Sequence, residues 1–198
     1  MATASSRTLK ERGIKMKVFD FDGTLYRGES VVDFFFFMLK KNPLLLFFLP
    51  VLVPTVIKYK LGRLEIDDLR KRADKFAFGI RKYRPKAEKY IAEFWRKQKK
   101  RLDLRLISLL KPGDVIISAA PRPLIEPVVK GFGDVVLIAS EFSLETGKFG
   151  FICMGENKLK AFREKFGATA RISVFYSDSN YDLPLAEIAD RFYLCPRP

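Results

Sequence analysis

The sequence contains no histidine among its 198 residues, and this absence excludes several classes of enzyme at once. Serine–histidine and cysteine–histidine nucleophiles, and metal centres with histidine ligands, all need the imidazole that the chain lacks. Only two cysteines occur, Cys153 and Cys195, too few for a disulfide framework and typical of a reducing compartment. Any catalysis must therefore use carboxylates, lysine, hydroxyls and a cation bound by oxygen atoms.

A simple transmembrane helix is also missing from the sequence. The uncharged run Leu44–Ile57 would span roughly 21 Å as a helix, and Pro50 and Pro54 interrupt it. A hydrocarbon core about 30 Å thick needs about 20 apolar residues. Residues 1–15 are polar and basic, without the apolar stretch of a signal peptide. We expect them to be a disordered leader, with Met16 as an alternative start.

Short apolar segments that alternate with helical patterns predict an α/β fold with a Rossmann-like parallel sheet. The predicted strands are 16–20, 114–118, 135–139, 171–177 and 191–195. The predicted helices between most of them are 122–130, 157–166 and 180–189. Hydrophobic residues make up 48% of the chain, enough to bury a core between the sheet and these helices.

More than ninety residues separate the first two predicted strands, too many for a loop. We predict that residues 30–111 form a helical cap inserted into a catalytic core made of residues 16–29 and 112–198. The predicted cap helices are two apolar ones, 30–40 and 43–57, and two basic ones, 65–78 and 85–109. Residues 40–111 hold 21 Lys and Arg but 7 Asp and Glu, so this segment carries the whole net charge of +14 and indicates an anionic partner.

Polar residues follow three of the predicted strands, namely Asp20, Ser118 and Asp178. Ligands of open parallel sheets bind outside the carboxyl ends of the strands, so these residues are expected to meet in one crevice. A carboxylate at Asp20 could attack phosphorus, and the neighbouring Asp22 could protonate the leaving oxygen and then deprotonate water. Gly23 permits a tight turn whose backbone amides could hold phosphate.

The segment Asp-Phe-Asp-Gly-Thr at 20–24 resembles the first motif of the haloacid dehalogenase superfamily, and three further segments resemble its other motifs. The resemblance implies that Asp20 is the nucleophile and Asp22 the general acid and base. The phosphate-binding positions that it implies are Thr24, Ser118, Ala119 and Lys158. The Mg²⁺ ligands that it implies are Asp20, the backbone carbonyl of Asp22, and Asp178. Asp182 would orient these ligands or bound waters without contacting the ion itself. Oxygen donors of this kind are the ligands that Mg²⁺ prefers.

The apolar part of the predicted cap indicates contact with a membrane interface. Val31–Leu39 contains four consecutive phenylalanines, and lysines flank both this run and Leu44–Ile57. With segments 120–124, 153–158 and 176–184, the pattern resembles the phosphatidylglycerophosphatase C family, which dephosphorylates phosphatidylglycerophosphate at the bacterial inner membrane. This resemblance implies a phosphorylated, anionic phospholipid substrate, membrane contact through cap residues 31–63 and a location at the cytoplasmic face. The sequence departs from that family at Ser118-Ala119-Ala120, where a Thr-Gly-Ser type is expected.

Two other functions are consistent with parts of the sequence. A cytoplasmic small-molecule phosphatase, similar to phosphoserine phosphatases, would use Glu29, which lies where that family has an acid that binds the substrate ammonium. The apolar runs would then form the core of the cap or a lid. A basic module with an inactive site would bind nucleic acid or membrane, but the complete set of acids favours catalysis, and we expect no nucleic-acid partner.

Overall fold

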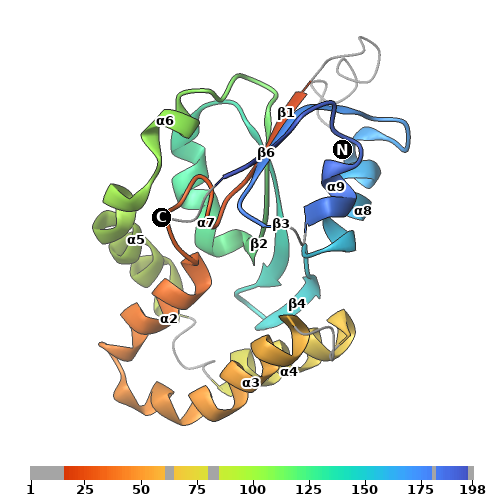
Figure 1. Ribbon diagram of the computed structural model, residues 1–198. Helices are drawn as coiled ribbons and strands as arrows, with labels where there is room; N and C mark the ends of the chain where they lie inside the picture. The colour runs from red at the N-terminus through yellow and green to blue at the C-terminus, as the bar shows by residue number, and fades with distance from the viewer. Residues whose placement is uncertain (1–15, 61–64, 80–84, 180–181, 196–198) are drawn as a thin grey trace.

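The computed structural model describes residues 16–60, 65–79, 85–179 and 182–195 (Figure 1), so the predicted leader, 1–15, lies outside the described residues. Its sheet has six strands in the order β4-β3-β2-β1-β5-β6. They are β1 (Met16–Asp20), β2 (Val115–Pro121), β3 (Val136–Ser143), β4 (Lys148–Phe151), β5 (Ile172–Ser177) and β6 (Phe192–Leu194). All neighbours pair in parallel except β3 and β4. The predicted α/β fold is confirmed.

The antiparallel edge strand β4 is absent from the strands predicted from the sequence. It forms a hairpin with β3 through a turn in which Gly147 has φ +70°, a conformation that glycine adopts without strain. Phe142 and Phe149 face each other across this hairpin, with ring centroids 4.8 Å apart. With only four residues, β4 is too short to show a clear alternation in sequence.

The sheet is covered on both faces by the helices that follow its strands. These are α7 (Arg122–Val129), the short 3-10 turn η4 (Lys130–Phe132), α8 (Glu156–Phe166) and α9 (Leu183–Ala186). Figure 1 shows α7 and the pair α8 and α9 on opposite sides of the sheet. Phe19 and Ile116 belong to the core cluster that includes residues of α7, whereas Val18 and Ile117 belong to the cluster that includes residues of α8 and α9. Alternate residues of each strand therefore enter two different cores, as expected of a parallel sheet.

The insertion after β1 is helical, as predicted, but two of its predicted helices are broken. Its elements are α2 (Ser30–Leu39), η1 (Pro43–Phe48), α3 (Leu49–Lys60), α4 (Ile66–Gly79), α5 (Ala87–Gln98), η3 (Lys99–Arg101) and α6 (Leu104–Ile107). The predicted helix 43–57 divides near Pro50, which lies in the first turn of α3, where a missing N–H costs little. Pro54, which was also expected to interrupt the run, lies inside α3 without ending it. The predicted helix 85–109 divides at Asp103, whose carboxylate caps α6 by accepting from the N–H groups of Arg105 and Leu106.

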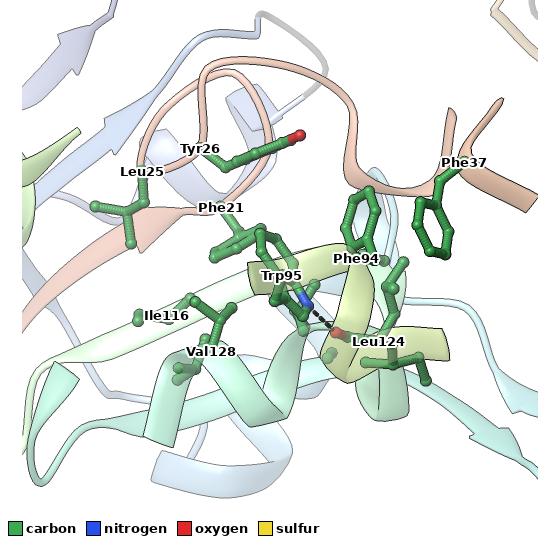
Figure 2. Close-up of a cluster of buried hydrophobic side chains, with 14 of the residues drawn as sticks. Phe21, Leu25, Tyr26, Phe37, Phe94, Trp95, Ile116, Leu124 and Val128 are labelled. Carbon is green, nitrogen blue, oxygen red and sulfur yellow. Dashed lines mark hydrogen bonds between the residues drawn. The ribbon is translucent and has the colours of Figure 1, made fainter. Parts of the chain in front are cut away.

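Helices α2 and α5, here called the inner cap, pack directly on the core. The ring of Phe94 contacts those of Phe34 and Trp95, at centroid distances of 5.3 and 4.9 Å. Figure 2 shows Phe94 beside Trp95. Trp95 Nε1 donates a 2.5 Å hydrogen bond to the carbonyl of Leu124, which fixes α5 to α7. Phe37 is buried in the same cluster. The phenylalanine run expected at a membrane interface therefore belongs largely to the protein core.

Elements η1, α3 and α4, here called the outer cap, differ from the inner cap. They carry large apolar side chains that are about half exposed or more, here called the outer apolar patch: Leu44, Leu46, Phe47, Val53 and Ile57. Helix α4 contacts β4, where the Asp74 carboxylate accepts a 2.7 Å hydrogen bond from the N–H of Phe149. Within the described ranges, no helix is both long and apolar enough to cross a bilayer.

Candidate active site

Asp20 ends β1 at the carboxyl edge of the sheet, and the loop after it is tightly closed on itself. The N–H of Gly23 donates to the carbonyls of Tyr26 (2.8 Å) and Gly28 (3.0 Å), and the N–H of Thr24 lies 3.4 Å from the carbonyl of Phe21. The Gly23 amide is therefore engaged within the turn. This arrangement does not support our expectation that the amides at Gly23 would hold phosphate.

The carboxylate of Asp178 lies against this loop. A Cβ atom added at Gly23 would be 2.0 Å from Asp178 Oδ2, and Gly23 also has φ +74°. Both the backbone conformation and the space therefore require glycine at this position. Asp20 ends β1 and Asp178 follows the adjacent parallel strand β5, so both lie at the same edge of the sheet.

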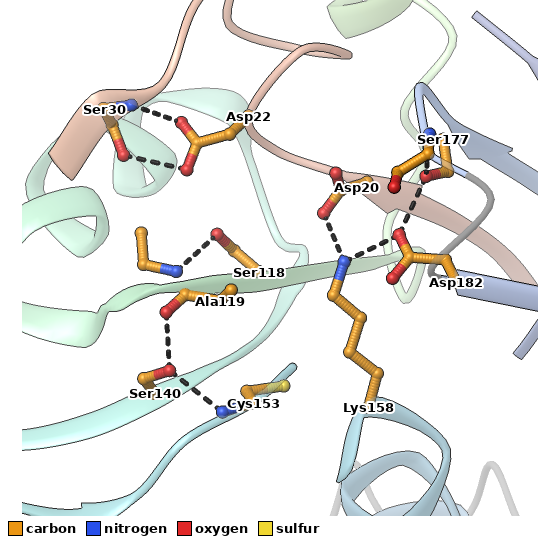
Figure 3. A network of polar contacts seen from close by, with 12 residues as sticks. Asp20, Asp22, Ser30, Ser118, Ala119, Ser140, Cys153, Lys158, Ser177 and Asp182 are labelled. Atoms are coloured by element: carbon orange, nitrogen blue, oxygen red, sulfur yellow. Dashed lines mark hydrogen bonds and ion pairs between the residues drawn. The ribbon is translucent and has the colours of Figure 1, made fainter. Parts of the chain in front are cut away.

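Lys158, in the first turn of α8, is buried between two carboxylates (Figure 3). Its Nζ atom lies 2.7 Å from Asp20 Oδ1 and 2.8 Å from Asp182 Oδ2. Ser177 adds a hydrogen bond from its hydroxyl to Asp182 Oδ2, also at 2.8 Å. By contrast, the neighbouring Lys160 is exposed, so Lys158 is the lysine that reaches the site.

Burial and pairing act in opposite directions on these charges. Burial lowers the pKa of Lys158, but the charges of Asp20 and Asp182 outweigh it and raise the pKa above its usual value. Burial also raises the pKa of Asp20, and the ion pair with Lys158 opposes that rise. Buried charges are tolerated when they are paired and hydrogen-bonded, which is the state of this cluster.

Asp22 points away from this cluster toward the first turn of α2 (Figure 3). Its two carboxylate oxygens accept hydrogen bonds from the N–H and the hydroxyl of Ser30, at 2.7 and 3.0 Å. Burial raises the pKa of Asp22 to about 7, although the Ser30 hydrogen bonds work to lower it. Ser30 is itself fully buried and connects the inner cap to the Asp20–Gly28 loop.

The remaining predicted phosphate ligands lie at the end of β2 and in the loop after β1. Ser118 is fully buried, and its Oγ accepts a 3.1 Å hydrogen bond from the N–H of Ala120. The carbonyl of Ala119 is held by the hydroxyl of Ser140 at 2.6 Å. Thr24 is also buried, and its Oγ1 atom has no hydrogen-bond partner in the structure. An unpaired buried hydroxyl in the loop that follows Asp20 fits a ligand-binding role.

Residues 18–187 match the family model of the haloacid dehalogenase-like hydrolases. The chain belongs to this family. The prediction that it is an enzyme, a hydrolase of this superfamily, is thereby confirmed. A probable phosphatase of Mycobacterium tuberculosis is 32% identical over 80 residues, which is 37% of this chain. That match covers 28% of the length of the mycobacterial relative.

Solved structures of similar fold cover nearly the whole chain. A protein of unknown function from Bordetella pertussis superposes with a TM-score of 0.71 and 19% identity, over 90% of this chain and 88% of the other. A phosphoserine phosphohydrolase-like protein from Francisella tularensis gives a TM-score of 0.60 and 22% identity, over 90% and 86% of the two chains. At these identities the likenesses show the fold alone.

The haloacid dehalogenase-like site has a donor set that fits Mg²⁺. Among the described residues, no three side chains of aspartate, glutamate or cysteine gather to hold a metal by themselves. A hydrated Mg²⁺ needs fewer, because one or two carboxylates together with carbonyl, substrate and water oxygens complete its octahedron. Asp20 and Asp178, with the carbonyl of Asp22, provide such a set, and the ion would neutralise charge on a bound phosphate.

Three serines of the site were missed by sequence reasoning: Ser30, Ser140 and Ser177. Ser177 directly precedes Asp178 at a strand end, so its position could have indicated it. Ser30 begins a predicted helix, but nothing in the sequence showed that the helix would face Asp22. Ser140 gave no signal, because its partners come from two other segments of the chain.

Proposed function

We propose that this haloacid dehalogenase-like hydrolase is a Mg²⁺-dependent phosphomonoester phosphatase with an aspartyl-phosphate intermediate. The observation that carries the proposal is the buried Lys158, which lies 2.7 Å from Asp20 at the carboxyl edge of the sheet. A cation fixed there lowers the repulsion between an attacking carboxylate and an anionic phosphate. The mycobacterial relative, named a probable phosphatase, supports the same chemistry.

The reaction would run in two displacements at phosphorus. Asp20 Oδ attacks phosphorus while the bond from phosphorus to the leaving oxygen breaks, and Asp22 gives that oxygen a proton. Asp22 then takes a proton from a water molecule, whose oxygen attacks the aspartyl phosphate. This second step releases inorganic phosphate and restores the Asp20 carboxylate. Ser118 and Lys158 would hold the phosphoryl oxygens, and Thr24 and Ala119 would line the same site.

For the substrate, a small soluble phosphomonoester is the class that the comparisons support better. One structural relative is named phosphoserine phosphohydrolase-like. Glu29 is the N-cap residue of α2 and is exposed, and it directly precedes Ser30, the residue that donates to the Asp22 carboxylate. A substrate ammonium at this point would be near both Glu29 and the acid that protonates the leaving oxygen.

A phospholipid such as phosphatidylglycerophosphate is the second candidate substrate, and one specific feature favours it. The outer apolar patch exposes Phe47 to 79%, and the sequence between Asp33 and Glu65 contains five basic residues but no acidic residue. Exposed apolar side chains beside lysines are typical of a surface that lies in an anionic membrane interface. The predicted position at the cytoplasmic membrane face belongs to this candidate.

The test is phosphate release, with Mg²⁺ and with EDTA, from three substrates assayed side by side. These are phosphoserine, an aryl phosphate and phosphatidylglycerophosphate in detergent micelles. Mg²⁺-dependent release that EDTA abolishes supports the phosphatase, and the preferred ester identifies the substrate class. No release from any ester by the folded protein would reject the proposed function.

A further inference from the structure

Ser140 lies outside every motif that the sequence indicated, and it is the last residue of β3 that pairs with β2. Its side chain is fully buried and makes two short hydrogen bonds. The hydroxyl donates to the carbonyl of Ala119 at 2.6 Å and accepts from the N–H of Cys153 at 2.9 Å (Figure 3). One hydroxyl thus joins the end of β2 to the segment that leads into α8.

The first bond replaces a missing contact of the sheet. Along the β2–β3 ladder, Ser118 pairs with Ala139 and the next pair is Pro121 with Ser140, so Ala119 and Ala120 lie in a register shift. Such an irregularity leaves backbone groups unpaired by the ladder, and buried backbone groups need partners. The Ser140 hydroxyl supplies the partner of the Ala119 carbonyl.

This bond also fixes the phosphate-binding hydroxyl. The Ala119 carbonyl and the Ala120 N–H belong to one planar peptide, whose carbonyl is held by Ser140 and whose N–H donates to Ser118 Oγ. Both polar ends of the peptide are therefore occupied, so the peptide cannot rotate without losing two hydrogen bonds. Because Ser118 Oγ accepts this bond with a lone pair, its own proton remains to be donated to a phosphate oxygen.

The second bond acts on the lysine side of the site. Cys153 is buried in the segment between β4 and α8, where Met154 N–H donates to the carbonyl of Ile152 at 3.1 Å. The N–H of Lys158 donates to the carbonyl of Gly155 at 3.0 Å in the first turn of α8. The bond from the Cys153 N–H to Ser140 therefore helps to fix the start of α8, and with it the position of Lys158 relative to Asp20.

We propose that Ser140 is a positioning residue that holds the Ser118 hydroxyl and Lys158 at the spacing that a phosphoryl group requires. The inference rests on the proposed phosphatase function and adds a residue to it. Ser140 itself does not touch the reacting atoms, and it acts through the Ala119 peptide and the Cys153 amide. We expect removal of the Ser140 hydroxyl to lower phosphate affinity more than it lowers the stability of the folded protein.

The experiment compares Ser140→Ala with Ser173→Ala by calorimetric binding of orthovanadate, with kcat, KM and thermal stability measured beside it. Ser173 is a matched control, because its hydroxyl donates a 2.9 Å bond to the carbonyl of Met16 at the opposite end of the sheet. For Ser140→Ala we expect vanadate affinity to fall about tenfold and KM to rise, since lost hydrogen bonds misplace two ligands. Ser173→Ala should lower stability and leave vanadate affinity unchanged.

Wild-type vanadate affinity in a folded Ser140→Ala variant would overturn the inference about Ser140 alone. If the alanine variant does not fold, Ser140→Cys decides, because a thiol is a weaker donor of similar shape. We expect about a threefold loss of vanadate affinity there, and an unchanged affinity would again overturn the inference. A wild-type protein that neither binds vanadate nor releases phosphate would instead reject the proposed phosphatase function.

Discussion

The carboxyl edge of the sheet and the outer cap differ in the kind of side chain that each buries. At the sheet edge, three charged side chains, Asp20, Lys158 and Asp182, are each no more than 5% exposed, and each has a partner within 2.8 Å. In the outer cap, apolar side chains such as Phe47 and Leu44 remain 79% and 58% exposed. Polar groups are thus hidden in one region while apolar groups face outward in the other.

From this contrast we infer that the sheet edge carries the reaction chemistry and the outer cap affects the choice of substrate. Buried, paired charges are costly unless they are fully satisfied, so the sheet edge tolerates few other arrangements. Exposed apolar side chains contribute little to folding, and larger exposed patches commonly mark binding surfaces. We therefore expect substitutions in the two regions to act on different measurements, and the following predictions test that expectation from the largest effect to the smallest.

The largest effect is expected at the nucleophile. Asp20→Asn removes the attacking carboxylate but keeps its shape, so phosphatase activity should fall by at least about 10⁴-fold while the protein stays folded. Asp190→Asn is the control, because Asp190 is an exposed carboxylate that lies 3.5 Å from Arg171, outside the candidate site. Activity assays with thermal unfolding measure both. Normal turnover in Asp20→Asn would break the assignment of chemistry to the sheet edge.

The second effect concerns the charge balance at that edge. Lys158→Met leaves Asp20 and Asp182 buried without their cation, and breaking a buried ion pair in this way costs about 3 kcal/mol or more. Lys160→Met, two residues along the same helix and exposed, should change the free energy of unfolding by less than about 0.5 kcal/mol. Urea unfolding of both variants gives the comparison. Equal effects would show that Lys158 is not the cation that balances the cluster.

The sequence predicted which strands converge at the sheet edge, because each strand is recognisable from a short apolar segment. Asp20, Ser118 and Asp178 each follow an apolar strand, and parallel strands bring their carboxyl ends together whatever the details of the loops. Lys158, the lysine that the motif resemblance implied, also lies next to Asp20, whereas Lys160 is exposed. What the sequence did not show is the hydrogen bonds from Ser30 and Ser140, since these depend on where a helix or strand from elsewhere packs.

The cap was harder to predict, because which of its side chains are buried also depends on how distant elements pack. Apolar runs look alike whether they face a core or the outside, so the phenylalanine run at 34–37 was interpreted together with Leu44–Ile57. The structure separates them, because Phe34 and Phe37 contact Phe94 of α5 edge to face while Phe47 is exposed. Tertiary packing decides which of these phenylalanines is buried, and the pattern of apolar residues over ten positions does not predict it.

A third, smaller effect is expected where the cap rejoins the core. The N–H of Asp103 donates to the carbonyl of Leu25 at 2.8 Å, and its carboxylate pairs with Arg27 at 3.0 Å. Burial works to raise the pKa of Asp103, but hydrogen bonds from Arg105, Arg27 and the Leu106 N–H outweigh it and lower the pKa to about 2.

Because this folded-state pKa lies below that of the unfolded chain, the ionised Asp103 stabilises the fold above about pH 4, and this contribution is lost as the pH falls toward 2. Asp103→Asn keeps the helix cap but not the charge, since asparagine caps helices as well as aspartate. We expect it to lower stability by about 1 kcal/mol at pH 7, a modest value because both arginines are largely exposed. Unfolding curves at pH 7 and pH 3 should show the difference shrinking in acid, and a gap that widens would contradict the assignment.

The smallest effect on stability, and the sharpest on substrate choice, is expected at Phe47 in the outer cap, with the buried Phe94 of the inner cap as its contrast. Phe94→Ala removes a fully buried ring and should cost about 3 to 5 kcal/mol, whereas Phe47→Ala removes an exposed ring and should cost less than about 0.5 kcal/mol. If a phospholipid is the substrate, Phe47→Ala should still lower activity on lipid micelles several-fold, because the lost ring would have entered the interface. The aryl phosphate in the same assay should be hydrolysed at the wild-type rate. Equal activity of Phe47→Ala on both substrates would favour the soluble ester and assign the outer apolar patch to another partner.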